Sequence, residues 1–196
     1  SSDGHQYLPQ VVQAGAIALV VEDVSMVPVD FKGAVVEVLD TRLSLQVLSQ
    51  KFYGSPGNEL LSIAVTGTNG KTSTTAIIEY LLNSQDQLCG VIGTIDHHIG
   101  KNVWETSLTT PDPVTLQARL KDFVDEGGKS FVIEASSHAL HQNRINQGFE
   151  VAIFTNLSRD HLDYHKDMDN YFHAKARLFK GNMLKEDKDC MAVVNL

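Results

Sequence analysis

Ile63-Ala64-Val65-Thr66-Gly67-Thr68-Asn69-Gly70-Lys71-Thr72 is the stretch that decides the fold of this chain. A short apolar run leads into a turn of small residues, then into Lys-Thr and a helix-compatible segment from Ser73 to Asn83. This strand–loop–helix order is typical of a phosphate-binding loop, in which glycines let backbone N–H groups approach an anion. The following helix presents its positive N-terminal end to the same anion. We therefore expect Lys71 to reach terminal phosphates and the Thr72 hydroxyl to ligate Mg²⁺.

The loop departs from the full phosphate-loop pattern at one position. The pattern G-x-x-x-x-G-K-[ST] places its first glycine where this chain has Val65. A glycine-rich turn with a chance Lys-Thr pair is the alternative interpretation. The order of strand, turn and helix favours a nucleotide site, whose candidate residues are Gly67, Thr68, Asn69, Gly70, Lys71 and Thr72.

The composition excludes several classes of protein. Among 196 residues, 16 are basic and 24 acidic, giving a net charge of −8, which argues against a nucleic-acid-binding surface. No apolar run reaches the roughly 18 residues of a membrane span, and no secretory signal is evident. Cys89 and Cys190 lie far apart and suit buried positions in a reducing cytoplasm, so we expect a cytoplasmic protein. The chain lacks an initiating Met and ends on a strand-like run, so we expect a fragment.

Residues 1–58 read as an incomplete α/β domain. Helices are predicted at 8–15 and 41–53, the second with Asp40 as its N-cap, and buried parallel strands at 16–21 and 34–38. The turn-rich segment 54–58 is the predicted boundary.

Residues 59–196 read as a central nucleotide-binding domain. Strands are predicted at 60–66, 88–94, 131–135 and 151–155, the last two buried, and another strand begins at 192–194. Helices are predicted at 73–83, 114–126 and 168–180, and a hairpin at 95–106. Alternating strands and helices predict an α/β fold with a mostly parallel sheet covered by helices on both faces. Ligands should gather at the carboxyl ends of its strands.

Polar residues follow two of these strands. Glu134 ends an apolar strand, where a carboxylate must be paired with a cation or bound to metal. Asp160 and His161 follow the strand at 151–155, and either could ligate Mg²⁺ or orient a phosphate, although a plain polar loop is the alternative. Lys175 lies within the last helix, where a lone lysine is usually solvated.

Five ordered motifs resemble those of the Mur ligases. They are T-G-T-N-G-K-T at 66–72, Thr109-Thr110-Pro111, E-A-S-S-H-A-L-H-Q-N-R at 134–144, T-N-L-S-R-D-H-L-D-Y-H at 155–165, and 171–179 with Ala174-Lys175. The loop type is shared with folylpolyglutamate synthase, but the D-H-L-D-Y-H string is similar to the MurE type. The resemblance implies an ATP-dependent amide ligase that adds the third amino acid, diaminopimelate or lysine, to UDP-MurNAc-L-Ala-D-Glu through an acyl phosphate in peptidoglycan biosynthesis.

The same resemblance implies roles for individual residues. Lys71, Glu134, His161 and Lys175 would be catalytic, and the loop with Asn156 would bind ATP. Mg²⁺ ligands would be Thr72, Glu134, His161 and, once N-carboxylated by CO₂, Lys175. Positions that would bind the UDP-MurNAc-dipeptide are His5, Thr109, Thr110, Ser136, Gln142 and Arg144. Leu108 stands where some relatives have Asn, so no side-chain contact is expected there.

The resemblance also bears on partners and on what the chain can do alone. We expect a monomer that is inactive by itself, because the family's third domain supplies the amino-acid site. Another Mur-type or folylpolyglutamate ligase, and a non-catalytic phosphate-loop module, remain alternatives.

Overall fold

The computed structural model describes residues 3–145, 147–185 and 189–195, and it divides the chain into two compact units. The first is Ser1–Leu45 and the second Gln46–Leu196, so the division falls within helix α2 (Thr41–Phe52). The sequence instead predicted a boundary at the turn 54–58. The ends of the predicted domains, residues 1, 2 and 196, lie outside the described residues.

The first unit contains a short helix and a two-stranded parallel sheet. Its elements are α1 (Leu8–Gln13), β1 (Ala18–Val21) and β2 (Ala34–Glu37), with Ala18 opposite Ala34. As predicted, the Asp40 carboxylate accepts hydrogen bonds from the backbone N–H groups at the start of α2. The strand predicted at 34–38 forms as β2 and pairs in parallel, but its predicted burial is wrong, because β2 is exposed along its whole length. Within the described part of this unit, the apolar core gathers around β1 and α1.

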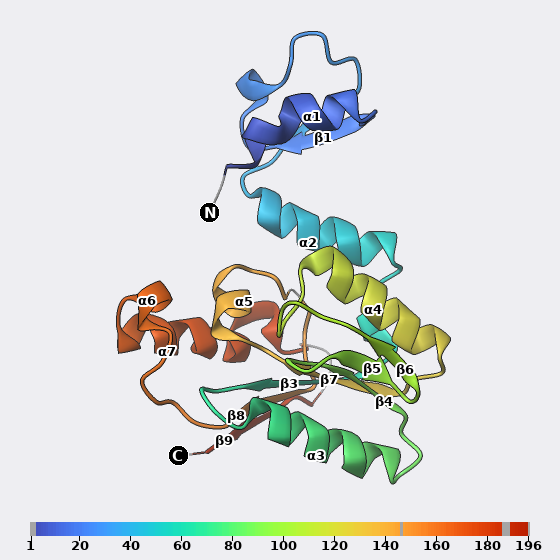
Figure 1. Cartoon of the computed structure of the whole chain (residues 1–196), viewed down its shortest axis with the longest axis vertical. Coiled ribbons are helices and arrows are strands. Elements are labelled where there is room, and N and C mark those ends of the chain that lie inside the picture. The colour runs from blue at the N-terminus through green and yellow to red at the C-terminus, as the bar shows by residue number, and fades with distance from the viewer. Residues whose placement is uncertain (1–2, 146, 186–188, 196) are drawn as a thin grey trace. The chain divides into compact units, whose positions relative to one another are not determined.

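The described residues of the second unit form a seven-stranded sheet in the order β6-β5-β4-β7-β3-β8-β9 (Figure 1). The bounds are β3 (Leu61–Thr66), β4 (Cys89–Ile92), β5 (His97–Ile99), β6 (Asn102–Trp104), β7 (Ser130–Glu134), β8 (Val151–Phe154) and β9 (Met191–Val194). Strands β4, β7, β3, β8 and β9 pair in parallel, whereas β4, β5 and β6 pair antiparallel. The mostly parallel sheet and the hairpin are therefore confirmed.

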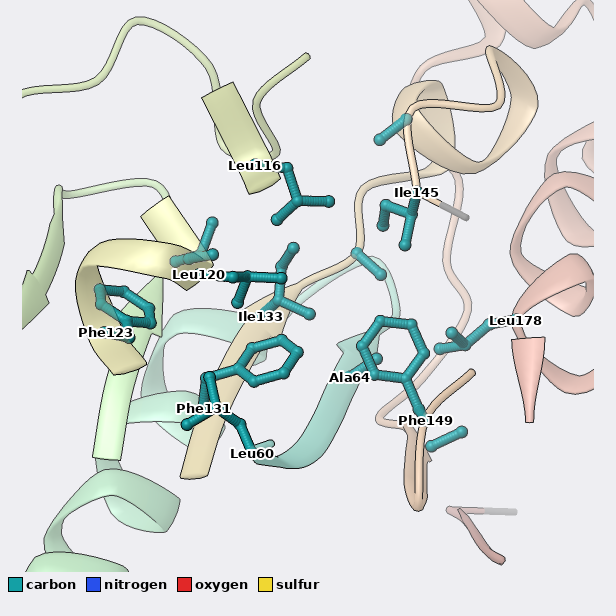
Figure 2. Close-up of a cluster of buried hydrophobic side chains, with 14 of the residues drawn as sticks. Leu60, Ala64, Leu116, Leu120, Phe123, Phe131, Ile133, Ile145, Phe149 and Leu178 are labelled. Atoms are coloured by element: carbon teal, nitrogen blue, oxygen red, sulfur yellow. The ribbon is translucent and has the colours of Figure 1, made fainter. Parts of the chain in front are cut away.

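Helices cover both faces of this sheet. Figure 1 shows α3 (Lys71–Asn83) on one face, with α4 (Pro113–Asp125) and α5 (Ser137–His141) on the other. Alternate residues of each strand point to opposite faces, and they build two separate cores. The larger core joins side chains of α4 to the sheet through Leu120, Phe123 and Phe131 (Figure 2). Full burial of each such side chain contributes about 1.5–3 kcal/mol, so the sheet is a rigid base for its loops.

The central strand β3 lies between β7 and β8, which the chain reaches later. The loops that follow these three strands therefore leave the same edge of the sheet, where ligands of such folds bind. Helices α6 (Leu162–His165) and α7 (Met168–Ala176) follow β8, and a 3₁₀ turn (Arg177–Phe179) continues α7. The helix predicted at 168–180 is thus shorter, because the backbone of Lys180 is extended. Among the described residues, no helix is long and apolar enough to cross a membrane.

Candidate phosphate and metal site

The loop between β3 and α3 requires glycine at two positions. Gly70 adopts φ +83° and caps the N-terminus of α3, whereas Gly67 adopts φ +144°. A Cβ atom on Gly67 would lie 1.9 Å from the Thr155 hydroxyl oxygen, so a side chain there is excluded by space as well as by conformation. Val65, the departure from the full pattern, lies inside β3 and is fully buried. The loop begins only after β3 ends at Thr66, so position 65 belongs to the strand and does not need a glycine.

A second loop, after β8, holds the first in place. The backbone N–H of Asn69 donates to the Asn156 side chain at 3.0 Å, and the Asn156 amide donates back to the Asn69 carbonyl at 3.0 Å. The Thr68 N–H donates to the Asn156 carbonyl at 2.9 Å. Asn156, predicted to contact nucleotide, therefore fastens the loop in this structure. The N–H groups at the start of α3 lack partners within the helix and can bind an anion.

Two lysines converge on one carbonyl of the loop. Lys71 donates to the carbonyls of Gly67 and Thr68 at 3.0 Å each, and Lys175 donates to the Gly67 carbonyl at 2.7 Å. Lys175 is only 1% exposed, and its ammonium lies 4.5 Å from the centre of the Tyr171 ring. The site therefore concentrates positive charge against the loop.

The two lysines have lowered pKa values. Burial, reinforced by the charge of Lys71, lowers the pKa of Lys175 to about 7, against the opposing effect of Asp160. Burial also lowers the pKa of Lys71, although the charges of Glu134 and Asp160 oppose this. A substantial fraction of Lys175 is consequently an uncharged amine at neutral pH.

Glu134 is buried at the end of β7, beside the start of α3. Its Oε1 accepts hydrogen bonds from the Thr72 hydroxyl and from the Thr94 N–H, both at 3.0 Å, and its Oε2 accepts one from the Thr94 hydroxyl at 3.0 Å. Among the described residues it forms no direct ion pair with a lysine, which was the alternative interpretation. The adjacent oxygens of Thr72 and Glu134 are the hard donors that Mg²⁺ prefers, so these two residues fit that ion.

Thr94 was missed by the sequence reasoning. It lies two residues after the end of β4, at the same edge of the sheet as Glu134, and that position was the available signal. Tyr171 was also missed as a site residue. Its hydroxyl donates to the Thr68 hydroxyl at 3.2 Å, so it supports the loop from α7.

His161 lies at the N-terminus of α6 with φ +52°. Its ring packs edge-on against His138 at 5.0 Å and Tyr171 at 6.0 Å between centroids, and its Nε2 is 3.5 Å from Asp160. Both His161 and Lys175 contact the Tyr171 ring, so His161 lies near Lys175. Among the described residues, no contact joins His161 to Glu134. Within the described residues, no three or more His, Cys, Asp or Glu side chains are grouped to hold a metal.

The predicted dipeptide-binding residues form one network that starts at Glu134. The Thr110 hydroxyl donates to the Glu134 carbonyl at 2.6 Å, and it lies 3.2 Å from the Ser136 hydroxyl. The guanidinium of Arg144 donates to the Thr110 carbonyl at 2.8 Å and to the Gln142 side chain at 2.9 Å. Thr109 joins through Thr94, whose hydroxyl lies 3.1 Å away.

His5 lies in the first unit. A cavity of about 610 Å³ opens there between the start of the chain, β1 and the start of α2. The His5 ring accepts a hydrogen bond from the Asp23 N–H at Nε2, so Nδ1 carries the proton that it donates to Asp3 at 2.6 Å. Only a proton-bearing Nδ1 satisfies both contacts.

A glycine-dependent loop at the carboxyl edge of a parallel sheet, facing a buried carboxylate and two lysines, defines a nucleotide-binding α/β domain of the phosphate-loop class. The family model of the Mur ligase middle domain matches residues 65–196. Because that match covers most of the chain, the chain belongs to the Mur ligase family.

Two curated relatives have the same name, UDP-N-acetylmuramoyl-L-alanyl-D-glutamate--2,6-diaminopimelate ligase. The relative from Geobacter sulfurreducens is 44% identical over 180 residues, which are 91% of this chain and 35% of that protein. The relative from Aquifex aeolicus is 46% identical over 178 residues, which are 90% of this chain and 36% of that protein. The chain thus spans a little over a third of the length of these relatives.

Solved structures agree with the fold. A structure with the same enzyme name is 37% identical, with a TM-score of 0.78 over 98% of this chain and 37% of that one. A MurF ligase from Thermotoga maritima in complex with ADP is 21% identical, with a TM-score of 0.57 over 97% of this chain and 39% of that one. The second likeness shows the fold alone.

Proposed function

We propose that this chain forms the ATP-binding part of an amide ligase that adds the third amino acid to UDP-MurNAc-L-Ala-D-Glu. The observation that carries the proposal is the meeting of Lys71 and Lys175 on the Gly67 carbonyl, beside the Thr72–Glu134 pair. The names of the relatives support diaminopimelate as the added residue. We place the reaction in the bacterial cytoplasm, with the enzyme as a monomer.

The reaction proceeds in two substitutions. An oxygen of the D-Glu carboxylate attacks the γ-phosphorus of ATP, and the bond to the leaving ADP oxygen breaks, which gives an acyl phosphate. The amine of the incoming amino acid then attacks the acyl carbon, phosphate leaves, and a proton is released as the amide forms. Phosphoryl transfer depends mainly on positioning and charge, which the α3 amides and Lys71 provide. Mg²⁺ bound at Thr72 and Glu134 would neutralise phosphate oxygens.

Lys175 is proposed to react with CO₂. The ammonium first loses one proton to give the free amine. This amine forms an N–C bond to CO₂ and loses a second proton, so that a carbamate anion replaces the cation. The buried position beside Lys71 supports this step, because it replaces a repulsive pair of cations by an attractive pair of opposite charges. The carbamate, with Glu134 and His161, would complete the oxygen and nitrogen donors of the magnesium site.

The network from Thr109 to Arg144 is proposed to hold the dipeptide end of the substrate. Thr109, Thr110, Ser136, Gln142 and Arg144 supply hydroxyl, amide and guanidinium groups that suit its carboxylates and amides. His5 is proposed to contact the uridine nucleotide in the other unit.

The test is release of ADP by this chain within a protein of the relatives' full length. The substrates are UDP-MurNAc-L-Ala-D-Glu and each candidate amino acid in turn. Lys175→Ala should abolish turnover, with partial rescue by added short carboxylates, whereas the exposed Lys129→Ala should retain it. ATP binding without any acyl phosphate would favour a non-catalytic module, and turnover with a folate instead would favour another ligase of the same chemistry.

A further inference from the structure

A second cavity is lined by residues of α5, α6 and α7. Helices α5 and α6 both contact α7 (Figure 1). The volume of the cavity is about 440 Å³, within the range of small-molecule sites. The side chains of α7 that line it, those of Asn170, His173 and Ala174, recur at helical spacing on one face, and Tyr171 and Lys175 do not line it. The basic lining residues are His141, His165, Lys166, His173, Arg177 and Lys180.

The charge of this cavity is uncompensated. Lys166, Arg177 and Lys180 carry permanent positive charges, and none forms an ion pair with a carboxylate among the described residues. The guanidinium of Arg177 donates only to neutral oxygens, those of the His141 carbonyl and the Asn143 side chain. In a chain with a net charge of −8, a hollow lined by cations and no carboxylate attracts anions.

Imidazole nitrogens accompany this charge. The His141 ring uses Nδ1 to contact the Tyr164 hydroxyl at 2.9 Å, and the His165 ring uses Nε2 to contact the Ser137 hydroxyl at 2.9 Å. Each ring keeps its other nitrogen for a ligand. Two acids lie at the start of α7: Asp167 caps the helix and accepts two hydrogen bonds from Asn170, and Asp169 lies in the first turn.

The backbone of Lys166 has a positive φ angle. It adopts φ +73°, a backbone conformation that residues with side chains rarely adopt. A glycine would relieve this strain, yet the chain places a cation at the rim of the cavity.

We propose that this cavity binds a small polyanion carrying phosphate or carboxylate groups, at a site separate from the phosphate loop. None of the loop residues from Gly67 to Thr72 lines it. The cavity adjoins the proposed dipeptide network, because the Gln142 amide donates to the Tyr164 hydroxyl at 3.0 Å, but neither the loop nor the proposed magnesium ligands line it.

The experiment titrates the chain with inorganic pyrophosphate and, in a second arm, with citrate. Two-dimensional NMR follows the His141 and His173 imidazoles together with the Gly70 amide. We expect the imidazole signals to saturate with their own dissociation constant, distinct from that of the loop. The double variant Lys166→Gly/Lys180→Gln should weaken binding at the cavity about tenfold, roughly threefold for each exposed cation, and leave the Gly70 response unchanged.

The matched control is Lys101→Gln/Lys129→Gln, which removes the same charge from exposed positions outside the cavity. Binding of either anion at the imidazoles, weakened only by the cavity variant, supports the site, and the stronger arm identifies the preferred group. Responses limited to the phosphate loop, or equal weakening by both double variants, would overturn the proposal.

Discussion

Replacing Lys175 by Met should stabilise the folded chain at neutral pH. Lys175 is almost fully buried, and its pKa is lowered from 10.5 to about 7 by burial and by the charge of Lys71. Methionine has nearly the same length and no charge, so it fills the space without an ammonium to desolvate. The Gly67 carbonyl keeps a hydrogen-bond partner, because Lys71 also donates to it.

The magnitude follows from proton linkage. A pKa lowered from 10.5 to about 7 corresponds to a cost of roughly 4–5 kcal/mol at neutral pH, at about 1.36 kcal/mol for each pH unit. The lost Lys175–Gly67 hydrogen bond offsets about 1 kcal/mol of this gain. We expect the variant to be more stable by about 3 kcal/mol at pH 7.

The sign of the pH dependence follows from the same lysine. Between pH 7 and 10.5 the unfolded chain binds more protons at Lys175 than the folded chain does. The stability of the unsubstituted chain therefore rises with pH in this window, and the advantage of the variant shrinks. At pH 9 the advantage should have fallen by about 2 kcal/mol.

Urea unfolding at several pH values between 7 and 9.5, in CO₂-free buffer, measures both effects. Lys129→Met is the control, because Lys129 is exposed and should change stability by less than about 0.5 kcal/mol. A Lys175→Met variant that is no more stable than the parent, or whose advantage does not change with pH, would refute the reasoning.

Three further predictions concern the loop glycines, Glu134 and His98. Gly67→Ala should abolish nucleotide binding and lower the stability measured by thermal unfolding by about 3 kcal/mol or more, because its Cβ would lie 1.9 Å from the Thr155 hydroxyl. Gly70→Ala places its Cβ in open space and should cost only about 1 kcal/mol. Equal losses would contradict the steric argument. Glu134→Gln should weaken Mn²⁺ binding, read by electron paramagnetic resonance, at least tenfold with the fold intact, and unchanged affinity would exclude Glu134 as a ligand. Burial lowers the pKa of His98, but the carboxylates of Asp96 and Glu79 outweigh this effect and raise it, so the ion pairs stabilise the fold below pH 6.5 and lose this effect as the pH rises. His98→Gln should therefore lower the free energy of unfolding by about 0.5–1 kcal/mol at pH 6 and by less at pH 8.5. A loss that does not change with pH would count against this.

The elements that sequence reasoning predicted well depend on short-range signals. The glycine turn and Lys71-Thr72 identify β3, the loop and α3 together, and Asp40 caps α2 as its side chain suggests. The hairpin at 95–106 also follows from local turn chemistry. Each of these features is decided by residues a few positions apart.

Burial could not be predicted in the same way. Leu43, Val47 and Leu48 occur at helical spacing, yet each is 44–52% exposed on α2, and β2 is an apolar run that is exposed throughout. Periodicity identifies an apolar face, but whether another element covers it is a tertiary property.

The contacts that shape the site are also tertiary. Glu134 meets Thr94 across neighbouring strands, and Lys175 meets Gly67 although 108 residues separate them in the sequence. The strand order β4-β7-β3-β8 brings these residues together, and no local pattern contains that order. The sequence motifs predicted which residues form the site, whereas their hydrogen-bond partners could be identified only from the fold.

These partners determine how a nucleotide meets the loop. Asn156, Tyr171 and Lys175 already hold the loop, so little ordering remains to oppose binding. In the proposed nucleotide complex, Lys71 would have to leave the two backbone carbonyls that it now contacts in order to reach a phosphate. A polyphosphate beside Lys175 also favours its ammonium form, which raises the lysine's pKa and removes the free amine. Under the proposed function, reaction of Lys175 with CO₂ is therefore favoured in the nucleotide-free site, and the carbamate then persists through its attraction to Lys71.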